Sequence, residues 1–369
     1  MDRLFDLLPS FLRTPLAFAV VLGVLVFIHE LGHYLAARWR GVYVEAFSIG
    51  FGKTLLSRTD KHGCEWRLCL LPLGGYVKLH GHEQPEDVTE EVRAAWRPGE
   101  TFNGKPVLSR AIVVAAGPIA NFVLAAVLFA ALFVAVGRPV TQPIAADVVA
   151  GGPAAQAGIM AGDRITSVAG NPIAVFEDIQ AIVSHNAGVA LPITVERDGQ
   201  SLQLTVTPQA NGSTALVGIR GGKVAYEHVS LIAALPEGVA QTWHVGVQTL
   251  EGVWQMISGS RGTGELGGPL RIAQLSGQVA QLGVASLVTF IAVLSVNLGL
   301  LNLFPIPILD GGHLVFFLLE ALRGKPLPPQ AQEYGLRAGF ALLASLFVFA
   351  TWNDLSHLGL FGWLAHLTG

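Results

Sequence analysis

The sequence predicts a polytopic α-helical membrane protein with about four transmembrane helices, a membrane-associated β-hairpin region and an inserted α+β domain outside the membrane. Charged residues make up 13% of the 369 residues, against about 25% in soluble proteins. Hydrophobic residues make up 51%, and the mean hydropathy is +0.53. These values exclude a disordered chain, and a net charge of −3 provides no basic surface for nucleic acid.

Four apolar stretches approach the length of about 20 residues that a membrane span needs. They are Thr14–Ala37, Ala111–Gly137, Ile272–Leu309 and Ala338–Asn353, and uncharged sequence also follows Asp354. No small-x-small cleavage site follows the first stretch, so we expect a retained span and not a signal peptide.

The connections between the spans predict the topology and the domains. Residues 38–110 carry eleven Lys and Arg against nine acids, and residues 138–271 carry seven against ten. The positive-inside rule therefore places the first connection in the cytoplasm, and the long second connection and both termini outside. We expect two spans in 1–137, a folded domain in 138–222, an amphipathic helical linker in 223–281 and two spans in 282–369.

The first connection has the pattern of strands and turns. Val42–Phe51 and Cys64–Leu79 are β-like, and the second run is interrupted at Pro72 and Gly74-Gly75. Strand backbone near a membrane must be buried in protein or line a wet cavity. We expect a hairpin whose exposed edge could pair with an extended peptide; an ordinary cytoplasmic hairpin is the alternative. The two cysteines are expected to be free thiols.

A His-Glu-x-x-His pattern, with His29, Glu30 and His33, lies inside the first apolar stretch. Positions i and i+4 of a helix share one face, so both imidazoles can bind one metal ion while Glu30 points at its water. This is the zinc-protease arrangement in which the glutamate is the general base. Ionisable residues in a span are costly and usually mark function; a structural polar cluster between helices is the alternative.

A catalytic zinc takes three protein ligands and keeps one position for water. Asp310 is the candidate third ligand, because Pro305, Pro307 and Gly311-Gly312 around it must open the helix at membrane depth. The alternative is that Asp310 only caps the next helix, and His313 is a rival ligand. Asn302 could hold a substrate backbone or polarise a carbonyl.

These motifs resemble the site-2 proteases, which are intramembrane zinc metalloproteases, and are most similar to the bacterial RseP branch (regulator of sigma-E protease). The likeness rests on His29–His33 in the first span and on Asn302–Gly312, with its Asn-x-x-Pro-x-Pro-x-Leu-Asp-Gly-Gly pattern. Phe47–Gly52 looks like the membrane re-entrant hairpin of that branch, and Pro72–Lys78 and Ala115–Asn121 look like two of its other motifs.

The resemblance implies the roles of the site residues. Glu30 is the catalytic base, and His29, His33 and Asp310 bind Zn2+. Asn302 and Asn297 match two asparagines near the family's active site. The candidate substrate-binding residues are Asn302, Asn297, Gly50, Gly52, Pro305 and Pro307.

The outer segment Ala145–Pro208 resembles a PDZ domain of the permuted bacterial type. Phe176–Ser184 has helical spacing, and Leu191–Arg197 and Leu202–Thr207 alternate like a hairpin around Asp198-Gly199. Gly151–Gly158 is expected to contain the carboxylate-binding turn. Either the domain binds peptide by strand addition, or it is only a steric gate. RseP relatives commonly carry two PDZ domains, whereas this chain has room for one.

Beyond the outer domain, large apolar residues recur every three or four positions and predict an amphipathic helix. They are Leu235, Val239, Trp243, Val247, Leu250, Trp254 and Ile257. This face could lie on the membrane surface or pack as core, and packing as core is the expectation.

The sequence therefore predicts a zinc endoprotease of the bacterial inner membrane that cleaves single-span membrane proteins within the bilayer. By resemblance, the substrate is an anti-sigma factor already trimmed by an upstream site-1-type protease; remnant signal peptides are a second possibility. The alternatives are a site-2 protease of another pathway, a metal transporter and an inactive PDZ scaffold. No internal repeat supports the transporter, and the intact Glu30 argues against the scaffold.

Overall fold

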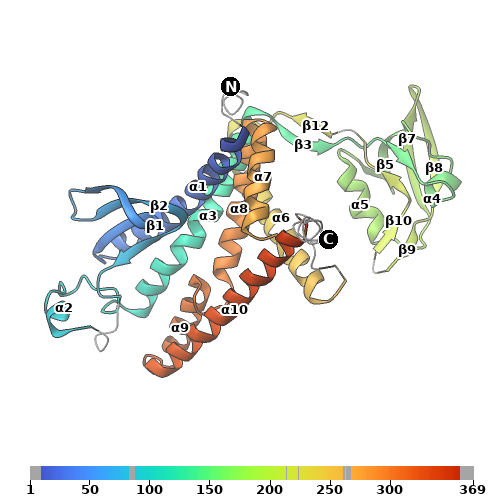
Figure 1. Ribbon diagram of the computed structural model, residues 1–369. Helices are drawn as coiled ribbons and strands as arrows, with labels where there is room; N and C mark the ends of the chain where they lie inside the picture. The colour runs from blue at the N-terminus through green and yellow to red at the C-terminus, as the bar shows by residue number, and fades with distance from the viewer. Residues whose placement is uncertain are drawn as a thin grey trace, which may run out of the picture. The chain divides into compact units, whose positions relative to one another are not determined.

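The fold was described from a computed structural model of the chain (Figure 1). It separates into two compact units. The first comprises Met1–Leu132 with Ile232–Gly369, and the second is Phe133–Leu231. The structure describes residues 10–82, 88–212, 214–222, 224–260, 262 and 267–357.

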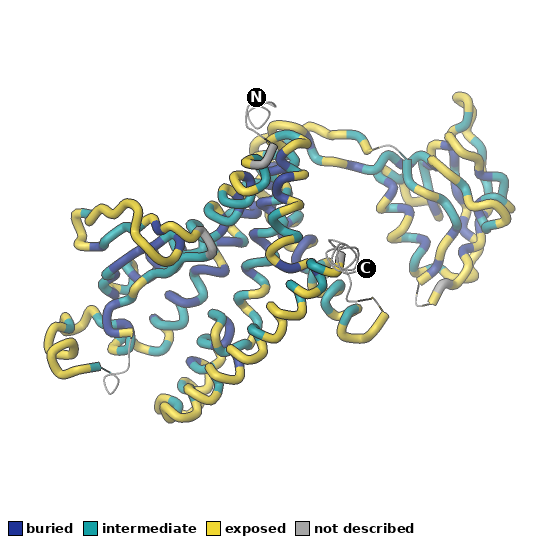
Figure 2. The backbone as a smooth tube through the Cα atoms, viewed as in Figure 1, coloured by how far each residue is buried: buried dark blue, intermediate teal, exposed yellow. Residues whose placement is uncertain are grey.

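The first unit is a helical bundle. In the part of the chain that the structure describes, four helices are long and apolar enough to cross a membrane, as predicted. They lie in α1 (Ser10–Trp39), α3 (Val107–Ala135), α8 (Val284–Leu303) and α10 (Pro329–His357). Most of α10 is exposed (Figure 2), which suits a helix that meets lipid. The predicted uncharged sequence after residue 357 lies outside the described residues.

The third apolar stretch does not form one helix. Residues 269–281 form α7, and α8 begins only at Val284. The break is at Gly283, whose φ of 106° is open to glycine but strained for other residues. A Cβ on Gly277 of α7 would collide with Thr14 of α1, so α7 packs closely against the first span.

Between the first two spans, β1 (Val44–Thr59) and β2 (Glu65–Leu79) form an antiparallel sheet, and the short helix α2 (Glu90–Ala94) follows. The strands bend so that residues 46–49 pair with 65–68 on one side and with 75–78 on the other. β2 is continuous through Pro72, where the sequence predicted an interruption. Residues 75–79 pair with β1 along one side and form an edge of this sheet.

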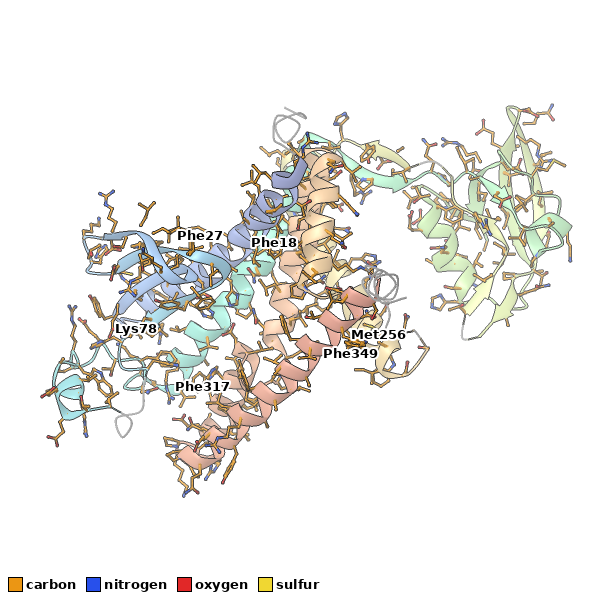
Figure 3. The ribbon with its side chains drawn as sticks, viewed as in Figure 1. Phe18, Phe27, Lys78, Met256, Phe317 and Phe349 are labelled. Atoms are coloured by element: carbon orange, nitrogen blue, oxygen red, sulfur yellow. The ribbon has the colours of Figure 1, made fainter. Side chains whose placement is uncertain are left out.

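The sheet is attached to α1 by polar and aromatic contacts. Asp60 accepts hydrogen bonds from Tyr34 Oη and Trp66 Nε1, each at 3.1 Å. Burial alone would raise the pKa of Asp60, but hydrogen bonds from Trp66, Tyr34 and the backbone lower it to about 2. Phe27 of α1 lies beside the sheet (Figure 3) and meets Phe47 edge-on at 5.7 Å. These contacts fix the sheet beside the middle of the first span.

The helix predicted after the outer domain is present as α6 (Leu231–Ile257), but the expectation that its large apolar face packs as core is wrong. Trp243 and Trp254 are 75% and 68% exposed. The opposite, small-residue face is the one that packs. A Cβ on Gly238 would meet Ala126 and Ala130 of α3, and Gly246 faces α8. Small residues allow two helix backbones to approach closely, and bulky side chains would prevent it.

The second unit is a small α+β domain. Its main sheet is antiparallel with the order β6-β5-β7-β8. The elements are β3 (Arg138–Thr141), β4 (Asp147–Val148), α4 (Pro153–Gln156), β5 (Arg164–Val168), β6 (Asn171–Pro172), α5 (Phe176–Ser184), β7 (Leu191–Arg197), β8 (Gln200–Val206), β9 (Gln209–Asn211), β10 (Thr214–Leu216), β11 (Ile219–Arg220) and β12 (Val224–Glu227).

The predicted helix and hairpin of this unit are confirmed. α5 has the predicted bounds, and β7 and β8 are joined by Asp198-Gly199. These two residues have φ values of 52° and 78°, which two-residue hairpin turns favour. β3 and β12 pair near the two ends of the unit, with Thr141 opposite Val224.

A buried ion pair that the sequence did not reveal stabilises this domain. Asp163 is 1% exposed, and Arg197 donates to both its oxygens, at 2.7 and 2.6 Å. Arg197 also donates to the carbonyl oxygen of Gly158 at 2.7 Å. The hydrogen bonds from Arg197 hold the pKa of Asp163 below its ordinary value. The resulting stabilisation is therefore present at neutral pH and is lost as the pH falls through that lowered pKa.

We predict that Arg197→Met destabilises the second unit by about 3–5 kcal/mol, because it leaves Asp163 buried and unpaired. Arg220→Met is the matched control, since Arg220 pairs with Asp147 at the surface, where both side chains are more than half exposed; it should change stability by less than about 1 kcal/mol. Pulse proteolysis of the full chain in urea measures both. Equal effects of the two substitutions would contradict the role of the buried pair.

Candidate active site

Three side chains that can bind a metal converge inside the helical bundle. His29 and His33 lie one turn apart on α1, and their Nε2 atoms are 3.2 Å apart. Asp310 begins α9 (Asp310–Arg323), and its Oδ2 lies 3.3 Å from Nε2 of His29 and 3.5 Å from Nε2 of His33. Among the described residues, these three side chains form a group whose geometry could hold a metal ion.

The separations match those of a zinc site. Zinc binds histidine nitrogen and carboxylate oxygen at about 2.0–2.2 Å in tetrahedral geometry, which places neighbouring ligand atoms about 3.3–3.6 Å apart. The observed distances of 3.2, 3.3 and 3.5 Å describe one face of such a tetrahedron. Its fourth corner is not supplied by these side chains, as a catalytic centre requires.

The surroundings of the three ligand atoms also fit a cation. Oδ2 of Asp310 is buried and has no hydrogen-bond partner among the described residues. An orphaned carboxylate oxygen in an apolar bundle is costly, unless a cation compensates it. Nδ1 of His33 donates to the carbonyl oxygen of Val113 at 2.9 Å, which leaves the lone pair of its Nε2 free for a metal.

Close approach of α1 and α3 creates the space for this cluster. A Cβ on Gly32 would overlap the backbone of Ala116, and a Cβ on Gly117 would overlap the rings of His33 and His29. Both helices therefore need glycine at these positions. Gly117 in particular leaves room for the two imidazoles against the backbone of α3.

Asp310 reaches the histidines because the chain opens before it. α8 ends at Leu303 and α9 begins at Asp310, so the residues between them, including Pro305 and Pro307, leave the helix as predicted. A Cβ on Gly311 would overlap the carbonyl oxygens of Leu303 and Phe304, so this turn needs glycine. His313 lies outside the cluster, with its ring 6.3 Å from that of His82.

Glu30 lies beside the edge of the β sheet that residues 75–79 form. Its carboxylate accepts a hydrogen bond from the backbone N–H of Val77. A Cβ on Gly75 would lie 3.1 Å from Cγ of Glu30, so glycine there lets the strand approach the helix. Residues 75–79 of β2 are thus held next to the glutamate that follows His29.

The predicted substrate-binding residues occupy different surroundings. Asn302 lies in the last turn of α8 and is partly buried. Asn297 lies earlier in that helix, and its Oδ1 accepts a hydrogen bond from Thr249 of α6 at 2.8 Å. Pro305 is exposed, whereas Pro307 packs against Gly339 of α10.

The two predicted glycines of the hairpin lie in β1. Gly50 and Gly52 have φ values of 88° and 84°. A Cβ on Gly50 would also collide with the carbonyl oxygen of Leu71. These glycines therefore shape the bend of the sheet, and among the described residues no hydrogen bond joins Asn302 or either glycine to the metal-binding group.

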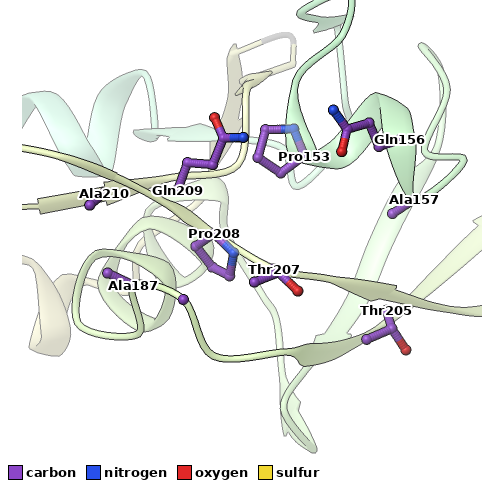
Figure 4. A pocket seen from close by; sticks show the side chains of 10 residues that line it. Pro153, Gln156, Ala157, Ala187, Thr205, Thr207, Pro208, Gln209 and Ala210 are labelled. Atoms are coloured by element: carbon purple, nitrogen blue, oxygen red, sulfur yellow. The ribbon is translucent and has the colours of Figure 1, made fainter.

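The second unit contains a hollow of about 810 Å³ (Figure 4). Its lining is neutral and small or polar: Pro153, Gln156, Ala157, Ala187, Gly188, Thr205, Thr207, Pro208, Gln209 and Ala210. None of these side chains is a metal ligand or a strong acid or base. The group of potential metal ligands described above lies in the first unit.

Comparisons with known proteins identify the class as zinc metalloproteases of the membrane. The family model described as Peptidase family M50 matches residues 17–346. The chain belongs to this family, the site-2 proteases, and is a zinc-dependent, multi-pass membrane protease. This membership supports the protease over a metal transporter or an inactive scaffold.

Individual relatives match over almost their whole lengths. The Rhizobium meliloti protein named "Putative zinc metalloprotease R01501" is 42% identical, over 97% of this chain and 98% of its own. Metalloprotease MmpA of Caulobacter vibrioides is 36% identical, over 97% and 99%. The regulator of sigma-E protease RseP of Salmonella typhimurium is 31% identical, over 93% and 98%.

Several residues around the site were not assigned a role from the sequence. Val113 and Val77 act through backbone atoms, which have no sequence signature. Gly117 lies within the Ala115–Asn121 motif, but its contact with the two histidines appears only once α3 is placed against α1. Asn121, whose side-chain amide lies 3.2 Å from Nδ1 of His29, was visible as a polar residue in an apolar span, and that signal could have been followed.

We predict that Gly117→Ala weakens zinc binding by about 10–100-fold, a loss typical when the groups around metal ligands are disturbed. The added methyl would lie 2.9 Å from Cε1 of His29 and still closer to His33, so both rings must move. Gly23→Ala in α1 is the control, because its Cβ would meet nothing within 4 Å. Chelator competition on purified protein measures both affinities, and unchanged affinity in Gly117→Ala would contradict this packing.

Proposed function

We propose that this protein cleaves the transmembrane segments of single-span membrane proteins inside the bacterial inner membrane. One observation carries the proposal. The Nε2 atoms of His29 and His33 and Oδ2 of Asp310 meet at 3.2–3.5 Å, with Glu30 beside them, within a bundle of helices apolar enough to span a membrane.

His29, His33 and Asp310 hold the zinc ion in this proposal, and Glu30 is the catalytic base. When bound, the zinc supplies a Lewis acid and brings the pKa of its water toward about 7. Glu30 accepts the proton of the attacking water and delivers it to the leaving amine. The hydrogen bond from the Val77 N–H orients the Glu30 carboxylate for both transfers.

The β sheet is proposed to hold the substrate in an extended form. A transmembrane helix must unwind before its peptide bonds can be attacked, and its freed backbone groups then need partners. The sheet edge at residues 75–79 offers such partners by strand addition at the backbone groups other than the Val77 N–H, which Glu30 occupies. The contact with Glu30 places this edge next to the site.

We assign the predicted substrate-binding residues to the binding of the same extended substrate. Asn302, at the opening after α8, contacts the substrate backbone beside Pro305 and Pro307. Gly50 and Gly52 shape the sheet that receives it. Asn297 acts at the α6 contact with Thr249.

The topology and substrate follow the sequence prediction and the resemblance. The sheet faces the cytoplasm, and the second unit and both termini lie outside. By the resemblance, the substrate is an anti-sigma factor that a site-1-type protease trims first; the Salmonella relative is named regulator of sigma-E protease RseP. Remnant signal peptides, or the substrate of another signalling pathway, are the alternatives.

The second unit is proposed to be a PDZ-like filter. It contains the helix and hairpin of the predicted PDZ-like pattern. In this proposal the catalytic groups lie in the first unit, so the second unit controls which substrates reach them, and it excludes proteins that retain bulky outer domains.

Glu30→Gln tests the mechanism. It should keep zinc, because the three ligands are untouched, but its cleavage rate should fall by about 10²–10⁴-fold, the usual contribution of a general base.

Asp310→Asn should lose zinc as well as cleavage, whereas His313→Ala should retain zinc, since His313 lies outside the cluster. The readouts are elemental analysis and cleavage of a tagged single-span substrate in co-expressing cells. Near-normal cleavage by zinc-loaded Glu30→Gln, or full zinc in Asp310→Asn, would reject the respective assignment.

Excision of residues 142–223 tests the filter. Thr141 and Val224 are paired across β3 and β12, so an Asn-Gly turn can join them without displacing either strand. The shortened enzyme should still cleave a substrate with a short outer segment. It should also cleave one with a bulky folded outer domain, which the full-length enzyme refuses.

The comparison requires equal expression and equal zinc content of the two enzymes. If the excised enzyme is zinc-loaded but no longer cleaves the short substrate, the second unit is a required docking site and not a filter. If it still refuses the bulky substrate, the exclusion arises elsewhere.

A further inference from the structure

Asn121 is a fully buried polar residue in an apolar helix. It lies on α3, is 0% exposed, and its neighbours along the helix are mainly apolar. Its backbone carbonyl accepts a hydrogen bond from Ser295 of α8 at 2.8 Å. Its side-chain amide lies 3.2 Å from Nδ1 of His29. A buried amide is costly unless it is hydrogen-bonded, so we expect the contact with His29 to be a hydrogen bond.

The chemistry of a metal-binding histidine decides which end of the amide makes this contact. If Nε2 of His29 binds zinc, the ring proton is on Nδ1, and Nδ1–H needs an acceptor. The amide nitrogen of Asn121 faces Nδ1, while its Oδ1 is buried without a partner among the described residues. A half-turn of the amide exchanges atoms of nearly equal size and gives Oδ1 the hydrogen that it lacks.

His33 shows the same arrangement with a backbone acceptor. Its Nδ1 donates to the carbonyl oxygen of Val113, also on α3, at 2.9 Å. Two acceptors on one helix, eight positions apart, would thus orient two imidazoles that lie one turn apart on α1.

We propose that Asn121 is the positioning residue of His29: its side-chain carbonyl accepts the Nδ1–H of the ring and keeps the Nε2 lone pair directed at the metal. This inference rests on the proposed ligand role of His29. Asn121 itself touches neither the metal nor the substrate. Losing such a contact typically costs about 10–100-fold in metal affinity.

The test measures metal binding by the purified full-length protein, without reference to cleavage. Asn121→Leu keeps the shape but removes the acceptor, so zinc affinity by chelator competition should fall about 10–100-fold. The visible absorption spectrum of the Co2+-loaded variant should shift as the His29 ring loses its orientation. Asn121→Asp supplies a carboxylate acceptor at the same place and should retain near-wild-type affinity and spectrum.

Ser295→Ala is the matched control. It removes a hydrogen bond to the backbone of Asn121 and leaves the amide itself unchanged, so affinity and spectrum should stay as in the wild type. Should Asn121→Leu fail to fold, Asn121→Ala carries the same expectation with less bulk.

Wild-type affinity and spectrum in Asn121→Leu would overturn the proposal. So would an equal loss in Asn121→Asp, because the amide N–H would then be the group that matters. His29→Ala separates this proposal from the one it rests on. If that variant binds zinc as tightly as the wild type, the assignment of His29 as a ligand is wrong, whatever Asn121 does.

Discussion

Two imidazoles and a carboxylate share one small volume between apolar helices, and much of the first unit is arranged around them. Polar atoms 3.2–3.5 Å apart would be costly there without a cation and without fixed outer partners. The helices can bring them together only by close backbone contact. Gly32, Gly117 and Gly311 allow this close approach at three different contacts. The same contacts therefore determine both the packing of the bundle and the geometry of the site.

A second consequence of placing the site among helices is that part of the backbone near it is not helical. A helix satisfies its own hydrogen bonds, so it offers few backbone groups to an unwound substrate. In the proposed function, the substrate meets such groups in two places: the opening between α8 and α9, and the sheet edge at residues 75–79 beside Glu30. The close contact of Gly311 with Leu303 and Phe304 fixes the opening, and the hydrogen bonds of Asp60 to Tyr34 and Trp66 hold the sheet against α1.

The helix α6 shows that packing and hydrophobicity can favour opposite faces of one helix. Its large apolar residues point outward, and Gly238 and Gly246 face the bundle. In water the opposite orientation would be favoured, because burying large apolar side chains is the main driving force of folding. In α6, close contact between small residues decides the orientation instead. The inner face of α6 also carries Thr249, which bonds Asn297.

Composition and motif spacing alone determined that the chain is a membrane protein, the number of candidate spans, and the histidine pair on one helical face, because these depend on period and length; the protease class came from the resemblance of its motifs. The break around Pro305 and the hairpin at Asp198-Gly199 followed from local backbone rules. Only the tertiary structure decided that Asp310 and not His313 meets the histidines, that Gly283 divides the third apolar stretch, and which face of α6 packs. It alone revealed Asn121 beside His29, and Arg197 beside Asp163. Such contacts join residues far apart in the chain through distance and shape, which no local pattern records.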